Sequence, residues 1–373
     1  MRTTPANNMD VKRLNRSNTL RCLLRCDKIS QPELAQKLKL SWPTVLQNVK
    51  ELTALGLVQE VGAYESTGGR KAKAYAPVRD AKLAVGLDIT QNHVGLVLVY
   101  LSGEILRYTR KKRVFSLQED YLASLGNLLT DFLEDGEGEK LLGIGVSLPG
   151  ILDEAGERLL YSHALDIYDV ETKRFSQHLP YPCIFLNDAN AAGMAELWNN
   201  PETENLIYLS LSNTVGGAII NGGKIYTGNT LRAGEFGHMT LVPNGRPCYC
   251  GKVGCLDAYL SAKVLSSHAD GNLAQFFERL RDHDKTATEV WTEYLQYLAV
   301  AINNLSMSFD CDVIAGGYVG AFLDEFGGPL REMLAQRNTF EHSGSYLKEC
   351  SFKLEASAVG AALLQVEQFL QEL

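Results

Sequence analysis

One stretch of the chain, residues 234–255, reads GEFGHMTLVPNGRPCYCGKVGC. Its histidine and three cysteines have the spacing His238-x9-Cys248-x-Cys250-x4-Cys255. The two nearer cysteines fall on the same side of an extended chain, and Gly251 and Gly254 allow the backbone to turn so that the last cysteine closes a tetrahedron with the histidine. The spacing predicts a structural Zn²⁺ site, because four protein ligands leave no open position. The alternative is three ordinary buried cysteines near an unrelated histidine.

The composition places the protein among reduced, globular chains. It has 373 residues, 45% of them hydrophobic, which favours two or three domains with a sizeable core. Eight cysteines are too sparse for a disulfide scaffold, and the remaining five show no ligand spacing and are expected to be plain core or surface thiols: Cys22, Cys26, Cys183, Cys311 and Cys350. No segment resembles a membrane span or an apolar signal region, so we expect a cytoplasmic protein without a membrane partner.

Charge divides the chain near Asp80. Residues 1–80 contain 14 Lys/Arg and 7 Asp/Glu, a net charge of +7, whereas the rest contains 22 against 37, a net charge of −15. A basic N-terminal segment on an acidic body fits a module that binds a polyanion. A merely solvated basic face would explain the charge alone equally well.

Two capped helices follow one another in this basic segment. Apolar residues at helical spacing predict a first helix from Asn18 to about Arg25. Ser30-Gln-Pro-Glu33 is typical of a capping box, and Ser41, with Pro43 in the first turn, caps another helix that ends at Gly56. This layout predicts a helix-turn-helix whose second helix enters the DNA major groove by its N-terminal end.

A basic hairpin completes the predicted DNA-binding module. Residues 57–61 and 70–76 are predicted to be two strands that pair as a hairpin, with Gly68-Gly69 before the second strand. Such a hairpin would be the wing of a winged helix-turn-helix. Lysine and arginine at such a tip suit phosphates or a narrow minor groove. The predicted DNA-binding residues are Ser41, Trp42, Thr44, Gln47, Asn48, Lys50, Arg70 and Lys71. The alternative is a small helical module that docks a protein and carries a solvated hairpin.

The body, residues 81–373, has the pattern of a mixed α/β domain. Predicted strands lie at Leu83–Ile89, His93–Tyr100, Gly103–Tyr108, Leu142–Ser147, Cys183–Leu186, Leu206–Leu211 and Gly217–Asn221, with helical stretches between some of them.

Four motifs in this order resemble the ROK family of repressors, open reading frames and kinases: Gly145-Val-Ser-Leu-Pro-Gly150, Asn187-Asp-Ala-Asn-Ala-Ala192, Gly234-Glu-Phe-Gly-His238 and the cysteine cluster. The resemblance runs from about residue 10 to the C-terminus. It implies an actin-like (ribonuclease H-like), two-lobed sugar kinase fold behind the winged helix-turn-helix of residues 1–80. The first lobe is expected at about 81–187 plus the C-terminal helix, and the second, with the zinc site, at about 188–355.

The same resemblance implies a sugar site in the cleft between the lobes. It places Asn187, Asp188, Glu235 and His238 around the sugar hydroxyls, with Pro149-Gly150 in the cleft wall. Amides and carboxylates suit vicinal hydroxyls because they donate and accept several fixed hydrogen bonds. Taken alone, Asn187-Asp188 is better explained by an Asx-type turn after a strand.

The predicted sugar site departs from the commoner family pattern at Asp257 and at Ser162-His163-Ala164. The family usually has a sugar-binding glutamate two residues after the last cysteine, and this chain has Asp257, which is one methylene shorter. This position and the segment Ser162-His163-Ala164 are expected to influence which sugar is accepted.

The phosphate-binding loops of catalytic members are altered. Asp188 would be their general base, but the two glycine-rich loops are replaced by Asp88-Ile-Thr-Gln-Asn92 and Ser212-Asn-Thr-Val-Gly-Gly-Ala218. Side chains at positions that approach phosphates closely carry a steric cost, so we expect weak or no ATP binding and no enzyme activity. Gly316-Gly317 matches the adenosine-binding position, although a tight turn explains it as well.

The sequence therefore predicts a sugar-responsive transcriptional regulator, most simply a repressor of carbohydrate-utilisation genes. Its expected partners are double-stranded operator DNA, a sugar or sugar phosphate, and further copies of the chain in a homodimer or homotetramer. The alternatives are an ATP-dependent sugar kinase that carries a DNA module, and a DNA-bound scaffold that docks only a protein.

Overall fold

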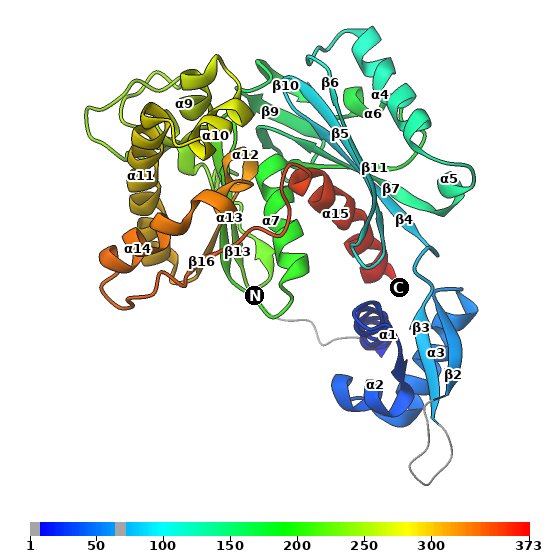
Figure 1. The fold of residues 1–373 in the computed structure, drawn as a ribbon. Coiled ribbons are helices and arrows are strands. Elements are labelled where there is room, and N and C mark those ends of the chain that lie inside the picture. Colours follow the sequence, from blue (N-terminus) through cyan, green and yellow to red (C-terminus); the bar gives the residue numbers. More distant parts are fainter. Residues whose placement is uncertain (1–7, 64–71) are drawn as a thin grey trace.

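The computed structural model describes residues 8–63 and 72–373. The N-terminal module combines helices with a small antiparallel sheet of order β1-β3-β2 (Figure 1). The bounds of its elements are α1 Asn8–Leu24, β1 Ile29–Ser30, α2 Gln31–Leu38, α3 Trp42–Ala54, β2 Val58–Ala63 and β3 Lys73–Pro77.

Both predicted helix caps are present. The Ser30 hydroxyl accepts a hydrogen bond from the Glu33 backbone N–H while the Glu33 carboxylate accepts one from the Ser30 N–H, which completes the capping box. Ser41 caps α3 by accepting from the Thr44 N–H, and Gly56 follows the helix with a φ of 72°. The helix-turn-helix prediction is confirmed at the level of its local hydrogen bonds.

Helix α1 begins ten residues earlier than the apolar periodicity predicts. Residues 9–14 are exposed even where they are apolar, and Lys12 and Arg16 form ion pairs of 2.7 and 2.9 Å with Glu51 on α3. These contacts between helices extend α1 beyond the part that packs in the core.

The wing strands pair antiparallel, with Val58 opposite Pro77 and Ala63 opposite Lys73. The predicted DNA contacts Arg70 and Lys71 lie outside the described residues. They therefore stay predictions.

The first lobe is built on a five-stranded sheet of order β11-β7-β4-β5-β6. Its strands are β4 Leu83–Ile89, β5 His93–Tyr100, β6 Ile105–Lys112, β7 Leu141–Leu148 and β11 Cys183–Asn187. Helix α4 (Glu119–Phe132) packs on one face and α15 (Ala356–Glu372) on the other, while short helices α5 (Glu137–Lys140) and α6 (Lys173–Ser176) lie beside it. A hairpin extends from this lobe as the small sheet β8 Ile151–Leu152, β9 Arg158–Ser162 and β10 Ile167–Glu171.

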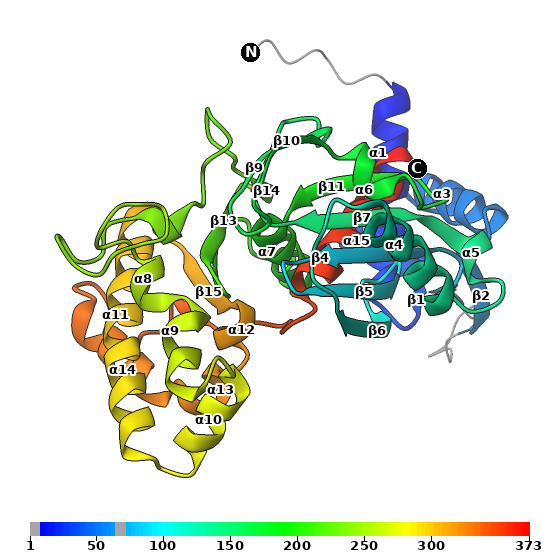
Figure 2. The same ribbon diagram turned by 90° about the horizontal axis from the view of Figure 1, so that it is seen from above.

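The second lobe has another five-stranded sheet, of order β14-β13-β12-β15-β16. Its strands are β12 Leu206–Leu211, β13 Val215–Asn221, β14 Lys224–Ile225, β15 Asp312–Gly316 and β16 Leu347–Lys348. Helix α7 (Asp188–Asn199) covers one face. The outer side carries α8 Asp257–Leu260, α9 Ala262–Ser266, α10 Leu273–Arg281, α11 Lys285–Phe309, α12 Gly317–Gly320, α13 Leu323–Phe326 and α14 Gly328–Arg337 (Figure 2), and two 3₁₀ turns lie at Phe236–His238 and Ser267–Ala269.

Helices α7 and α15 lie side by side between the two sheets (Figure 1). Glycine permits this close packing, because a Cβ on Gly360 of α15 would lie 1.6 Å from the Ala191 carbonyl oxygen of α7. Gly145 likewise lets strand β7 approach α15, since a Cβ there would lie 1.8 Å from the Ala361 carbonyl oxygen. The lobes are thus joined through two helices in backbone contact.

A single hydrophobic cluster connects the N-terminal module to the body. It contains Leu20 of α1, Val49 of α3, and Val366 and Leu370 near the end of α15, all at most 2% exposed. Burial of this shared apolar surface holds the module against the C-terminal helix. Within the described ranges, no helix is both long and apolar enough to cross a membrane.

Candidate functional site

A cavity of about 1000 Å³ lies between the lobes. Its walls include six of the seven residues predicted to contact sugar: Pro149, Gly150, Asn187, Asp188, Glu235 and His238. The structure therefore brings together residues that lie up to 89 positions apart in the chain. Whether they bind sugar stays a prediction.

Asn187 occupies the junction between strand β11 and helix α7. Its Oδ1 caps the helix by accepting from the Asn190 N–H at 2.9 Å, and its Nδ2 donates to the Gly150 carbonyl at 3.0 Å and to Asp188 Oδ1 at 3.1 Å. The turn proposed as an alternative for this pair is present, and it also aims both side chains at the cavity. A ligand that moves the Asn187 side chain would therefore also move the start of α7.

Gly150 is required where it stands. Its φ is 127°, and a Cβ there would lie 2.4 Å from the Tyr161 carbonyl oxygen of the hairpin. Only glycine lets the hairpin approach this wall of the cavity.

Two buried carboxyl groups, Asp188 in the cavity wall and Asp88 on β4, lie close enough to interact electrostatically. Burial raises the pKa of Asp188 to about 7, and the nearby Asp88 and Glu235 carboxylates add to the rise. Burial also raises the pKa of Asp88 to about 6, even though the Ser147 hydroxyl donates a hydrogen bond to it. At neutral pH, Asp188 is poised between its neutral and charged forms, so it can donate or accept a hydrogen bond.

The four predicted metal ligands converge. One ligand atom from each of His238, Cys248, Cys250 and Cys255 lies within 4.8 Å of all the others. The sulfur atoms of Cys250 and Cys255 are 3.7 Å apart, close to the roughly 3.8 Å that a tetrahedron of ~2.3 Å Zn–S bonds requires. Gly251 and Gly254 have φ of 82° and 79°, as the predicted turns need. The donor set and spacing fit a tetrahedral ion with no open position.

Sequence reasoning missed Tyr249, which stands between two of these cysteines. Its hydroxyl lies 3.3 Å from Nε2 of His238, its ring stacks on His163 at 4.1 Å between centroids, and it lines the cavity. Alternation could have indicated this: when Cys248 and Cys250 point toward the metal, the residue between them points the other way.

Asp257, the seventh residue predicted to bind sugar, is not part of the cavity wall, and its role stays a prediction. Asp257 is 5% exposed and accepts a hydrogen bond of 2.6 Å from the Val215 N–H. Its shorter side chain is thus engaged by the backbone at the start of β13. Of the other specificity segment, His163 and Ala164 do line the cavity.

The DNA-binding candidates on α3 divide into two groups. Trp42, Gln47 and Lys50 are exposed, as is Leu46, which sequence reasoning left out although it falls on the same outer face. Ser41 is exposed too, and its hydroxyl caps the helix. Thr44 is half-buried beside it.

Asn48 was wrongly grouped with these residues. It is 1% exposed, and its Nδ2 donates to the Thr19 hydroxyl at 2.9 Å. The side chain therefore joins α3 to α1 inside the module, where it has no access to DNA.

The sequence matches two family profiles: the ROK family over residues 84–368, and a winged helix-turn-helix DNA-binding family over residues 14–59. The xylose repressor of Bacillus spizizenii is 29% identical over 68% of this chain and 67% of its own. The xylose repressor of Caldicellulosiruptor bescii is 25% identical over 88% of this chain and 89% of its own length.

Solved structures share the fold. A ROK family transcriptional regulator, a homologue of the Escherichia coli MLC protein, superposes with a TM-score of 0.74 at 20% identity over 97% of both chains. A ROK family glucokinase from Streptomyces griseus, in complex with glucose and AMPPNP, gives 0.63 at 23% identity over 76% of this chain and 98% of that one. The predicted two-lobed, actin-like fold behind a winged helix-turn-helix is confirmed.

Proposed function

The chain belongs to the ROK family, and on this premise we propose that it is a transcriptional regulator whose affinity for operator DNA changes when a sugar enters the cleft. The named xylose repressors among its relatives support regulation of carbohydrate use. A non-enzymatic role fits the same relatives.

One continuous path of packed helices supports the coupling. Helix α7 begins at Asp188 in the cavity and packs against α15 through Ala191 and Gly360. The far end of α15 shares a core with α1, and Arg21 of α1 pairs with Glu367 of α15 at 2.7 Å. A sugar that shifts α7 would therefore move the element on which the DNA-binding module rests. Ligand shifts this balance only by binding the two arrangements unequally.

The outer face of α3 supplies the proposed DNA contacts. Trp42 and Leu46 are 48% and 46% exposed and offer apolar contact to thymine methyl groups, while Gln47 and Lys50 offer hydrogen bonds to base edges or phosphates. Two such helices in a homodimer would read paired half-sites.

Contacts beside the altered loop at Asp88 and at the retained Gly316-Gly317 turn argue against the kinase alternative. Arg110 on β6 donates a hydrogen bond of 2.8 Å to the hydroxyl of Tyr318 on α12, and its guanidinium lies 5.1 Å from that ring's centroid. This contact joins the lobes next to Asp88 and leaves the arginine engaged with a side chain. Gly317 has a φ of 77° and its N–H donates to the Tyr208 hydroxyl, so the tight turn accounts for the retained glycines.

A Zn²⁺ ion would be held by His238, Cys248, Cys250 and Cys255, where it would supply a rigid cross-link and no reaction chemistry. The cluster places His238 in the cavity wall. The metal would thus fix the orientation of a residue that faces the ligand.

Operator fragments selected from random DNA provide the test. We expect one class of sugar to change the Kd of the selected DNA at least fivefold, and Asn187→Ala to abolish that change. Asn199→Ala, at the other end of α7, is the matched control and retains it. Phosphorylation of any sugar at ordinary enzymatic rates with ATP and Mg²⁺, or DNA affinity that no bound sugar alters, would overturn the proposal.

A further inference from the structure

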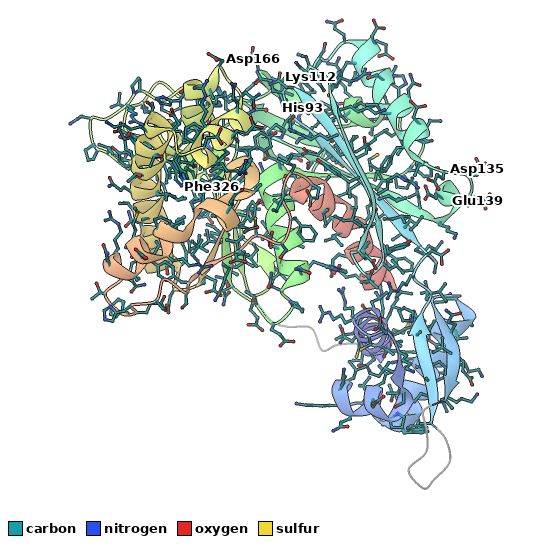
Figure 3. The ribbon with its side chains drawn as sticks, in the orientation of Figure 1. His93, Lys112, Asp135, Glu139, Asp166 and Phe326 are labelled. Atoms are coloured by element: carbon teal, nitrogen blue, oxygen red, sulfur yellow. The ribbon has the colours of Figure 1, made fainter. Side chains whose placement is uncertain are left out.

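His163 and Tyr249 join the two lobes across the cavity. His163 follows strand β9 in the hairpin of the first lobe, and Tyr249 belongs to the cysteine loop of the second. Their rings stack at 4.1 Å between centroids with an interplanar angle of 15°. Figure 3 shows the tip of the same hairpin, at Asp166, reaching toward the elements of the second lobe. We call this pair the aromatic clasp.

Each ring of the aromatic clasp also contacts a further side chain. Tyr249 meets the His238 ring edge-on, at 5.4 Å and 73°, with its hydroxyl 3.3 Å from Nε2. The Tyr161 hydroxyl lies 3.3 Å from Nδ1 of His163. All four side chains line the cavity, and Tyr249 remains 41% exposed to it and to solvent. The clasp therefore has a defined position and an accessible edge.

The stack leaves no gap that a ligand substituent could enter. Aromatic rings whose centroids are about 4 Å apart are in van der Waals contact. A sugar that is hydrogen-bonded to His238 would place the substituent nearest to this histidine against Tyr249 and His163. A sugar hydroxyl fits there, because it can form a hydrogen bond with the Tyr249 hydroxyl. An acetamido substituent is larger and would have to displace one of the two stacked rings.

The charge of the cavity disfavours sugar phosphates. Four carboxyl residues, Asp153, Glu154, Asp188 and Glu235, line it against one arginine, Arg232. A phosphate group would bring up to two further negative charges into this acidic surrounding, which Coulomb repulsion and the loss of its hydration disfavour.

We propose that the aromatic clasp of His163 and Tyr249 is a specificity determinant that restricts the cleft to uncharged, unsubstituted monosaccharides. This inference rests on the proposed function, because it assumes that the cleft takes a sugar. It adds the class of sugar and the residues that select it.

Calorimetric titration of the full-length, metal-loaded chain tests the inference. The probes are D-xylose, L-arabinose, D-glucose and D-galactose as uncharged sugars, N-acetyl-D-glucosamine as the bulky one, and D-glucose 6-phosphate as the charged one. The wild type is expected to bind an uncharged sugar at least tenfold more tightly than either of the last two.

Substitutions in the clasp then test its role. Tyr249→Ala and His163→Ala are expected to reduce the preference over N-acetyl-D-glucosamine at least tenfold, whereas Tyr249→Phe, which keeps the stack, retains it. Tyr226→Ala removes an exposed tyrosine that does not line the cavity and serves as the control. Zinc stoichiometry and melting temperature check that each variant keeps the cysteine loop folded.

Tighter binding of glucose 6-phosphate or N-acetyl-D-glucosamine by the wild type would overturn the inference while leaving the proposed function intact. So would a Tyr249→Ala variant that weakens all sugars equally. A wild-type chain that binds operator DNA but no sugar of any kind would instead overturn the proposed function.

Discussion

Arg21 of α1 and Glu367 of α15 form an ion pair of 2.7 Å that links the DNA-binding module to the C-terminal helix. Both side chains are about a quarter exposed, and Gln371 donates a further hydrogen bond to the same carboxylate oxygen. The pair therefore lies where a movement of α15 would displace α1, the helix that packs against α3.

Breaking this pair should weaken coupling more than stability. We expect Arg21→Ala to lower the free energy of unfolding by no more than about 1 kcal/mol, because the pair is partly solvated. The sugar-dependent change in DNA affinity should fall severalfold, as measured by fluorescence anisotropy with and without sugar. The double variant Arg21→Glu/Glu367→Arg should recover part of the response, and full coupling in the single variant would contradict the path through α15.

The raised pKa of Asp188 predicts a pH-dependent stability. The folded chain holds this proton up to about pH 7, while the unfolded chain releases it near pH 4. Between these values the folded state binds more protons, so the free energy of unfolding falls as pH rises, by up to about 4 kcal/mol at ~1.4 kcal/mol per pKa unit.

Asp188→Asn removes this titration. Its melting temperature should change less between pH 4.5 and 7.5 than that of the wild type, and it should be the more stable of the two at pH 7.5. Identical pH profiles for the two proteins, measured by calorimetry, would show that the carboxyl is not held in its neutral form.

Removal of zinc should destabilise the second lobe. Chelation of a purified chain that holds one equivalent is expected to lower its melting temperature by on the order of 5 °C, since a cross-link among four side chains is lost. The Cys250→Ser variant should have this lower melting temperature before chelation, and chelation should not lower it further. The Cys311→Ser variant, changed outside the cluster, should behave like the wild type. Metal content by mass spectrometry decides whether the ligand set is the one proposed.

Lys50 and Asn48 should separate DNA contact from module stability. Lys50→Ala removes an exposed charge and is expected to reduce the salt dependence of DNA binding by about one unit of slope, with little change in melting temperature. Asn48→Ala leaves the buried Thr19 hydroxyl without its donor and should cost about 1–3 kcal/mol of stability while leaving the salt slope unchanged. The reverse pattern would return Asn48 to the DNA interface.

Features that depend on neighbouring residues could be predicted from the sequence. The caps at Ser30 and Ser41 use hydrogen bonds that span three residues, and the turns at Gly251 and Gly254 follow from backbone sterics. Strand β4 was predicted to the residue, because a short apolar run between turns has few other structures open to it. The family motifs added the lobes and the cleft residues.

Other features were decided only by the tertiary structure. Asn48 looks like any exposed polar residue of a recognition helix until α1 packs against it. The Asp257 carboxylate accepts a hydrogen bond from the backbone at the start of β13, which no local pattern predicts. The aromatic clasp brings together residues 86 positions apart, and Arg110 meets a tyrosine 208 positions away. Local pattern carries no information on such pairs, because the packing of two lobes against α7 and α15, rather than any short segment, sets the distance between them.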